Sequence, residues 1–281
     1  MYAGPNTLWI SADRQTRFVW NPALERTEKY VAGTLVGYEY ANMDVPIIGQ
    51  SAQMKTRLFE DFHGTWAIGD AGPADRWSTT AGSGTNNAVA TTVANSLCGE
   101  VTLKSASDDG AHSANASSLT AINLGWKANQ GGLSAEFRVK LDAITAAALF
   151  VGFTDTISST VEMPIFLNGA DIDSDAADAC GIIFDTDGTT AQWAHGGVKA
   201  NTDTVPAYSG GAPVAGTYDV LRVEVSAAGA VQGFINNVAI GDPVANAVTI
   251  TTALTPAVVV CNRGAAQRIA TIDYIDVQMN R

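Results

Sequence analysis

Residues 133–141, Leu-Ser-Ala-Glu-Phe-Arg-Val-Lys-Leu, alternate strictly between apolar and polar or charged side chains. Successive side chains of a β-strand point to opposite faces, so this pattern predicts a strand with one buried and one solvated face. The apolar run Leu149–Phe153 follows after a short connector and predicts a second strand. A strand that is half solvated is typical of an antiparallel sheet with one face on a core.

The same alternation returns in other parts of the chain. It occurs at Val101–Lys104, Leu221–Val225 and Ile272–Met279. Turn-forming residues, Ala227-Ala228-Gly229 and Asn236-Asn237, stand between neighbouring candidate strands. Short strands with regular turns and no convincing amphipathic helix predict one all-β domain, a sandwich or jelly roll, from about Leu58 onward.

Composition and charge exclude several classes of partner. Among 281 residues, 46% are hydrophobic and 16% are charged, and the net charge is −12. Such an acidic chain repels phosphate backbones and anionic lipid surfaces, so we expect no nucleic-acid partner and no membrane partner. The first residues lack the basic and apolar regions of a signal peptide, and no apolar stretch approaches the ~18 residues of a membrane span.

Residues 1–56 differ from the rest of the chain. Residues 1–60 hold six basic and six acidic side chains, so the whole net charge lies on residues 61–281. This first segment is rich in large apolar side chains but too short for a core of its own. We therefore predict an N-terminal extended arm (residues 1–56) before the sandwich (residues 57–281). The arm would bury its apolar residues either on the sandwich or on another chain.

Several segments of the sequence resemble one known superfamily. They are Phe59-Glu60-Asp61-Phe62-His63-Gly64-Thr65-Trp66, Gly131–Val139, Tyr218–Val225, Phe234–Asn237 and Ile272–Val277. Together they resemble the concanavalin A-like lectin/glucanase domains of the laminin-G-like type. The resemblance covers the chain from about Leu58 and implies a jelly roll of two curved antiparallel sheets. Lectins, glucanases and bacteriophage virion proteins share this fold, so it does not assign a function alone.

The catalytic strand of the glucanase branch is missing. That branch carries a Glu-x-Asp-x-x-Glu strand, which places two carboxylates on one face. Glu136-Phe137-Arg138 has Arg where the pattern needs Asp, and Glu162-Met163-Pro164 has Pro there. Retaining glycosidases need two carboxylates about 5–5.5 Å apart. We therefore assign no catalytic residue and expect no enzyme activity by this route.

The densest acidic cluster offers a candidate cation site. It consists of Asp171, Asp173, Asp175 and Asp178, and alternating aspartates resemble the start of a calcium loop. The closing Glu and central Gly of an EF-hand are absent, so a solvated acidic loop is the competing interpretation. Asp185-Thr186-Asp187-Gly188 predicts a turn in which Gly188 supplies a positive φ. We assign no metal ligand and no cofactor, with calcium kept as the alternative.

Other reactive side chains do not form a recognisable site. The histidines His63, His112 and His195 are too far apart in sequence for a metal pair. Cys98, Cys180 and Cys261 match neither a disulfide framework nor a zinc pattern, and we interpret them as buried free thiols. Trp77, Trp126 and Trp193 could stack on a sugar or pack in the core. Asn115-Ala116-Ser117 is a glycosylation sequon that we expect to be unused.

Two functions fit this sequence. The first is a non-enzymatic virion protein, a bacteriophage capsid decoration protein that is assembled in the host cytoplasm. Such a protein would attach to capsid or other virion proteins partly through residues 1–56, and we expect a homo-oligomer. The alternative is a carbohydrate-binding, lectin-like module for surface glycans, aided by calcium at Asp171 and Asp173 or by stacking on Trp193.

Overall fold

The computed structural model describes residues 7–10, 16–21, 26–31, 34–40, 43–45, 55–62, 77–93, 99–108, 112–121, 125–156, 163–209 and 211–280. For residues 7–45, 89–92, 112 and 113 the description covers the backbone. The chain divides into two compact units, Met1–Lys55 with Arg281, and Thr56–Asn280. None of the described helices is long and apolar enough to cross a membrane.

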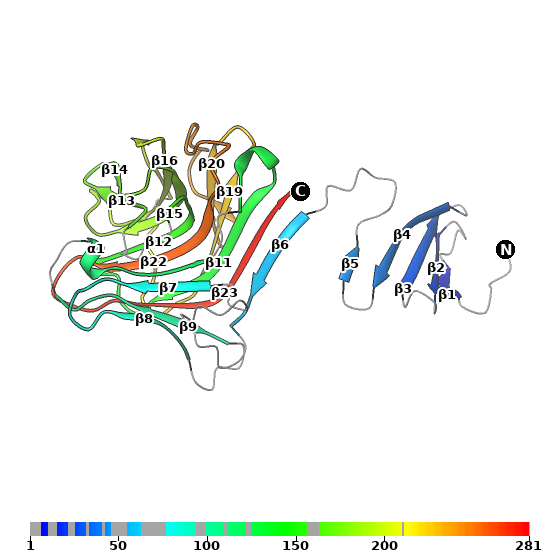
Figure 1. Cartoon of the computed structure of the whole chain (residues 1–281), viewed down its shortest axis with the longest axis horizontal. Helices are drawn as coiled ribbons and strands as arrows, with labels where there is room; N and C mark the ends of the chain where they lie inside the picture. The colour runs from blue at the N-terminus through cyan, green and yellow to red at the C-terminus, as the bar shows by residue number, and fades with distance from the viewer. Residues whose placement is uncertain are drawn as a thin grey trace. The chain divides into compact units, whose positions relative to one another are not determined.

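The first unit contains a sheet of its own. Its strands are β1 (Thr7–Ile10), β2 (Thr16–Asn21), β3 (Arg26–Val31), β4 (Thr34–Tyr40) and β5 (Met43–Val45). They pair antiparallel in chain order. The segment that we predicted as an arm forms a five-stranded antiparallel meander, in which its strands pair with one another (Figure 1). Where its apolar side chains are buried stays a prediction.

The second unit is a sandwich, and we call its first sheet sheet I. Its strands are β7 (Trp77–Ala81), β10 (Ser117–Ala121), β12 (Ala147–Thr154), β15 (Ala179–Asp185), β16 (Trp193–Lys199), β17 (Thr202–Asp203), β18 (Ala207–Tyr208) and β22 (Thr255–Asn262). The order across the sheet is β17-β16-β15-β12-β22-β10-β7, and β18 also pairs with β16.

The second sheet, sheet II, packs against sheet I. Its strands are β6 (Lys55–Glu60), β8 (Ala88–Thr92), β9 (Val101–Lys104), β11 (Leu133–Leu141), β19 (Asp219–Val225), β20 (Val231–Ile235), β21 (Val238–Ala239) and β23 (Ile269–Asn280). The order is β21-β20-β19-β11-β23-β9-β8, and β6 also pairs with β23. A helical turn α1 (His112–Asn115) and a 3₁₀ turn η1 (Ala128–Gln130) are the described helices.

The main core lies between the two sheets. On β11 every odd-numbered residue from Leu133 to Leu141 is buried and contributes to this core, and the even-numbered residues are partly exposed. The alternation that predicted this strand is thereby confirmed. The predicted turns are also present, because Gly229 has φ 80°, and Asn236 and Asn237 have φ 49° and 68°. Two consecutive left-handed residues match the right-handed twist of a two-residue hairpin.

A second apolar core covers the outer face of sheet I. The hairpin of β13 (Ile165–Asn168) and β14 (Asp171–Ser174) packs over β15, as Figure 1 shows. Hairpin residues such as Phe166 and Ile172 share this cluster with Phe150, Ile183 and other residues of sheet I. Every residue of β12, β15 and β22 is buried as a result. Strands covered on both faces read as continuous apolar runs without alternation.

Candidate functional site

The tryptophans suggested as sugar-stacking residues belong to the core. Trp77, Trp126 and Trp193 are 6%, 7% and 3% exposed. The Trp193 ring meets the Phe184 ring edge-on at a centroid distance of 5.7 Å. A ring enclosed in this way cannot stack on a ligand. Of the two interpretations, core packing is confirmed.

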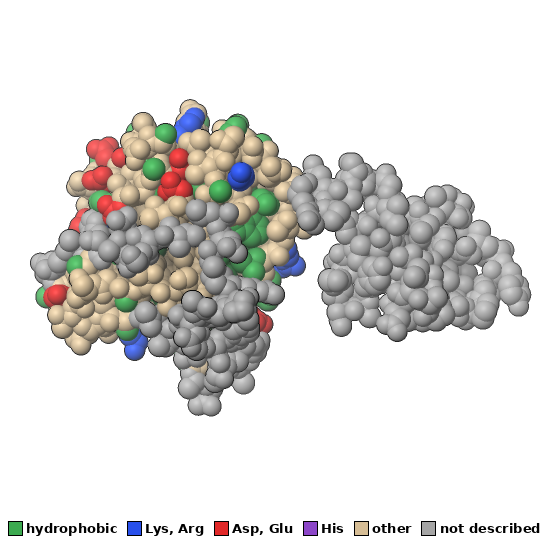
Figure 2. All heavy atoms as spheres, viewed as in Figure 1, with side chains coloured by type: hydrophobic (Ala, Val, Ile, Leu, Met, Phe, Trp, Pro, Cys, Tyr) green, Lys and Arg blue, Asp and Glu red, His purple; other side chains and the backbone are tan. Residues whose placement is uncertain are grey.

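The acidic cluster is divided between two environments. Asp171 and Asp173 are exposed on the outer side of β14, and acidic side chains gather on this face in Figure 2. Asp178 is buried and accepts hydrogen bonds from the Thr249 backbone N–H at 2.6 Å and the Thr252 hydroxyl at 3.3 Å. Asp178 thus fixes a neighbouring loop. Within the described ranges, no three His, Cys, Asp or Glu side chains are grouped to hold a metal ion.

The predicted turn at 185–188 contains a buried ion pair that the sequence did not reveal. The Arg263 guanidinium makes two hydrogen bonds to the Asp185 carboxylate, the one from Nε at 2.9 Å, and their side chains are 3% and 0% exposed. Asp185 also accepts the backbone N–H groups of Leu167 at 3.1 Å and Asp187 at 3.0 Å. Burial raises the pKa of the Asp185 carboxyl, and the bonds from Arg263 oppose that shift. The pair fastens the β13–β14 hairpin to sheet I.

The prediction that Gly188 has a positive φ was wrong. Gly188 is not among the glycines with positive φ in the described residues. A Cβ at this position would lie 2.8 Å from Leu167 Cδ1 on the hairpin. Glycine at this position leaves room for the Leu167 side chain of the hairpin, which packs against the glycine backbone.

The described histidine is a core residue. His195 on β16 is fully buried, and burial lowers its pKa to about 4. A Cβ on Gly233 of β20 would lie 3.1 Å from the His195 Cβ, so the imidazole lies between the two sheets. The side chains of His63 and His112 lie outside the described residues. His195 is therefore neutral at pH 7 and occupies a position without access for substrate.

Two of the three cysteines are buried free thiols, as predicted. Cys180 contributes to the core between the sheets, and Cys261 to the cluster under the hairpin. Burial raises the pKa of each thiol to about 12. The thiolate is the nucleophilic form of cysteine, so both side chains are unreactive in the folded protein. Cys98 lies outside the described residues.

The sequon asparagine is also buried. Asn115 is 1% exposed, and its side-chain nitrogen donates to the Asp108 backbone carbonyl at 2.8 Å. That nitrogen is the atom that glycosylation would modify. The expectation that this sequon is unused agrees with its position in the fold.

On the outer face of sheet II, charged and aromatic side chains of the described strands are exposed or partly exposed and form a network. Arg57 on β6 donates to both oxygens of Asp276 on β23, at 2.8 and 2.9 Å. The Phe59 ring lies 5.7 Å from the Arg57 guanidinium carbon and 6.2 Å from the Tyr274 ring. The Tyr274 hydroxyl donates to Glu136 at 2.8 Å. Burial and this bond to Glu136 raise the pKa of Tyr274.

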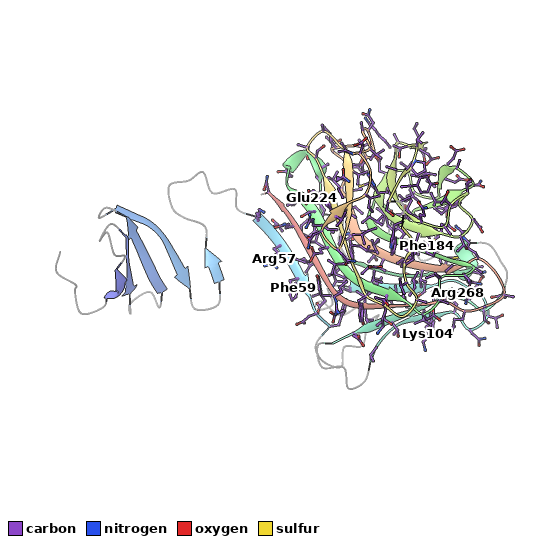
Figure 3. All side chains as sticks on the ribbon, turned by 180° about the vertical axis from the view of Figure 1, so that it is seen from behind. Arg57, Phe59, Lys104, Phe184, Glu224 and Arg268 are labelled. Carbon is purple, nitrogen blue, oxygen red and sulfur yellow. The ribbon has the colours of Figure 1, made fainter. Side chains whose placement is uncertain are left out.

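The network continues across β11 and β19. Arg138 is paired with Asp273, and its guanidinium lies 4.2 Å from the Tyr218 ring centre. The Tyr218 hydroxyl donates to Glu100. Arg222 lies 2.9 Å from Glu224 and 4.3 Å above the Phe234 ring. Figure 3 labels Arg57 and Phe59 on β6 and Glu224 on β19. These contacts join residues far apart in sequence, which is why the sequence alone did not show them.

In the described part of sheet I, the outer face of β15 is covered by the β13–β14 hairpin. On β15 the positions that face the hairpin include Ala179 and Ile183, which are buried in the second core cluster. Asp185 at the end of this strand is held by Arg263. The two carboxylates that a Glu-x-Asp-x-x-Glu strand would display are therefore not present on β15, and apolar packing occupies its outer face.

Comparisons with known proteins give a fold but no family. No protein-family model and no curated protein matches the chain. A Bacillus licheniformis β-glucanase matches with TM-score 0.51 and 13% identity over 80% of this chain and 98% of its own. A native glycosidic hydrolase matches with TM-score 0.52 and 12% identity over 79% and 95%.

A prokaryotic β-1,3-1,4-glucanase (lichenase) from a mouse hindgut metagenome matches with TM-score 0.50 and 12% identity, over 79% of this chain and 98% of its own. Identities this low show the shared architecture and not a shared activity. Two antiparallel sheets packed face to face, with these structural neighbours, identify residues 56–280 as a concanavalin A-like jelly-roll sandwich.

Proposed function

We propose that the chain is a non-enzymatic structural protein of an assembled particle, and specifically a bacteriophage capsid decoration protein. The observation that supports this most is the cover that the β13–β14 hairpin gives to the outer face of β15 in sheet I. The β13–β14 hairpin fills it with apolar side chains and is pinned by the buried pair of Asp185 and Arg263. A jelly roll whose strand β15 is covered on this face suits display and attachment better than turnover of a polymer.

The two-unit organisation also supports the proposal. Met1–Lys55 forms a separate compact unit, and its part of the sequence is neutral while the sandwich part carries the net charge. In this proposal the first unit binds capsid proteins or a second copy of the chain, and the sandwich is presented outward. The strong negative charge then keeps displayed sandwiches soluble and apart.

The proposal is tested on the particle itself. Virions of a bacteriophage that encodes this chain are purified. Quantitative peptide mass spectrometry then measures the number of copies of the chain relative to the major capsid protein. We expect many copies of the chain per particle, and we expect a chain that lacks residues 1–54 to be absent from particles although it folds. Virions that contain no copy of the full chain would refute the virion assignment, and undiminished incorporation of the truncated chain would refute attachment through the first unit.

Glycan binding is the second candidate function. Two structural neighbours are β-glucanases, and the outer face of sheet II presents aromatic and charged groups together. Affinity electrophoresis of the full chain in soluble β-1,3-1,4-glucan, with and without calcium, measures this directly. Retarded migration supports glycan binding. Unchanged migration in this glucan, followed by no signal on a broad glycan array, contradicts it.

A further inference from the structure

The corner of sheet II formed by β6 and β23 combines the chemical groups that a sugar ring needs. Phe59 is 47% exposed, and it is the one phenylalanine among the exposed large hydrophobic side chains of the described residues. Its neighbour on the chain, Leu58, packs against the core, so the alternation of β6 turns Phe59 and Arg57 to the outer face. A single exposed hydrophobic side chain is ordinary on a protein surface, so a site at this corner depends on the groups that surround Phe59.

The Phe59 ring is held by its surroundings. Tyr274 lies beside it with an angle of 33° between the rings, and Tyr274 is fixed in turn by its bond to Glu136. The Arg57 side chain is fixed by its two bonds to Asp276, which raise the pKa of the guanidinium. A platform whose side chains are already ordered loses little conformational entropy when a ligand binds.

The groups around the ring match a pyranose in character. One face of a β-linked pyranose presents C–H groups, whose positive hydrogens favour the negative face of an aromatic ring. Its edge carries hydroxyls, which donate to carboxylates and accept from guanidinium groups. Asp276 and Glu136 are 25% and 29% exposed and Arg57 is 62% exposed, so all three retain solvent-facing surface next to the rings.

We infer that a neutral pyranose unit of a β-linked glycan binds at this corner, with Phe59 as the stacking platform. Tyr274 supports the ring, and Arg57 and Asp276 meet the hydroxyls. The inference rests on the second candidate function, glycan binding, and names its site. It places the ligand on sheet II because the outer face of sheet I is occupied by the hairpin.

The experiment uses the full chain and soluble β-1,3-1,4-glucan in affinity electrophoresis, followed by calorimetry with a β-glucan tetrasaccharide. Phe59→Leu keeps an apolar side chain but removes the aromatic face, and we expect at least tenfold weaker binding. Phe59→Trp keeps the face, and we expect binding within about threefold of the original protein. Val238→Ala is the control, because Val238 is 70% exposed on β21 at another edge of sheet II.

The possible outcomes distinguish a failure of the Phe59 site from a failure of glycan binding as a whole. Weakened binding for Phe59→Leu, with Val238→Ala unchanged and equal melting temperatures, supports the site. Full affinity for Phe59→Leu overturns the site and leaves glycan binding standing. No binding of this glucan by the original chain, followed by no signal on a broad glycan array, overturns both. Because about half of Phe59 is exposed, we expect these substitutions to leave the fold intact, and near-ultraviolet circular dichroism verifies this.

Discussion

Gly181 on β15 lies directly opposite Gly152 on β12, and a Cβ on Gly152 would lie 2.6 Å from the Gly181 Cα. Gly196 on β16 continues the row as the partner of Gly181. This row of glycines forms a shallow strip across sheet I, under the hairpin. Ile172 of the hairpin sits there, because a Cβ on Gly196 would lie 2.4 Å from its Cδ1 atom. Because glycines have no side chain, this strip leaves room for the hairpin side chain that packs on it.

The strip predicts a coupled pair of substitutions. Gly196→Ala should destabilise the protein by about 1–3 kcal/mol because it overpacks the contact with Ile172. Ile172→Val removes the clashing Cδ1 atom and alone should cost about 0.5–1.5 kcal/mol. In urea unfolding, we expect the double variant to lose less stability than the two single losses combined.

Gly181→Ala is the control for Gly196→Ala, because it adds a side chain to the same row without meeting Ile172. A Cβ there would lie 2.3 Å from the Val151 backbone carbonyl, which no side-chain change can relieve. We expect Ile172→Val to give no recovery in that background. Additive losses for Gly196→Ala and Ile172→Val would show that the contact with Ile172 is not the main cost, which would then lie in the Thr204 Oγ1 contact at 2.9 Å.

The buried ion pair gives a second prediction. Arg263→Met leaves the Asp185 carboxylate buried without its cation and should cost about 3–5 kcal/mol. Asp185→Asn with Arg263→Met removes the charge but keeps an oxygen for the Leu167 N–H, so part of this loss should return. Hydrogen exchange should show the loss first in residues 163–176. Equal instability of the single and double variants would contradict the assignment of the pair as a pin.

His195 gives a pH prediction. Its pKa is lowered from 6.5 to about 4 in the folded protein, so below pH 6.5 the unfolded chain binds the proton more tightly. The free energy of unfolding should therefore fall as pH decreases from 6.5 towards 4, by up to about 3 kcal/mol, and this contribution is constant above pH 6.5. Urea unfolding across this range, compared with His195→Leu, isolates the effect. An identical pH slope in both proteins would contradict it.

Strands with one solvated face could be predicted from the sequence. Strands that are covered on both faces were harder to predict, because they lack the alternation of apolar and polar residues. The alternation of Leu133–Leu141 survives because only one side of β11 is buried. Residues of β12, β15 and β22 contribute to both apolar clusters, one on each face of sheet I, so they are apolar or small without a period of two. Their pairing and the hairpin itself could not be derived from periodicity.

The network on sheet II and the buried ion pair both depend on contacts between residues that are far apart in sequence. Arg57 and Asp276 are 219 residues apart, and Asp185 and Arg263 are 78 residues apart. A single sequence carries no signal that brings such residues together. Trp193 and Asp178 are structural because both are buried, and burial cannot be recognised from residue type alone.

The most direct test of the account concerns the first unit. Light scattering after size-exclusion chromatography is measured on the full chain and on residues 55–281, a truncation that keeps β6 whole and with it the Arg57–Asp276 pair. We predict a folded monomer for residues 55–281 and a defined oligomer for the full chain. A full chain that is also a monomer, and that binds no capsid protein, would contradict the claim that residues 1–54 carry assembly.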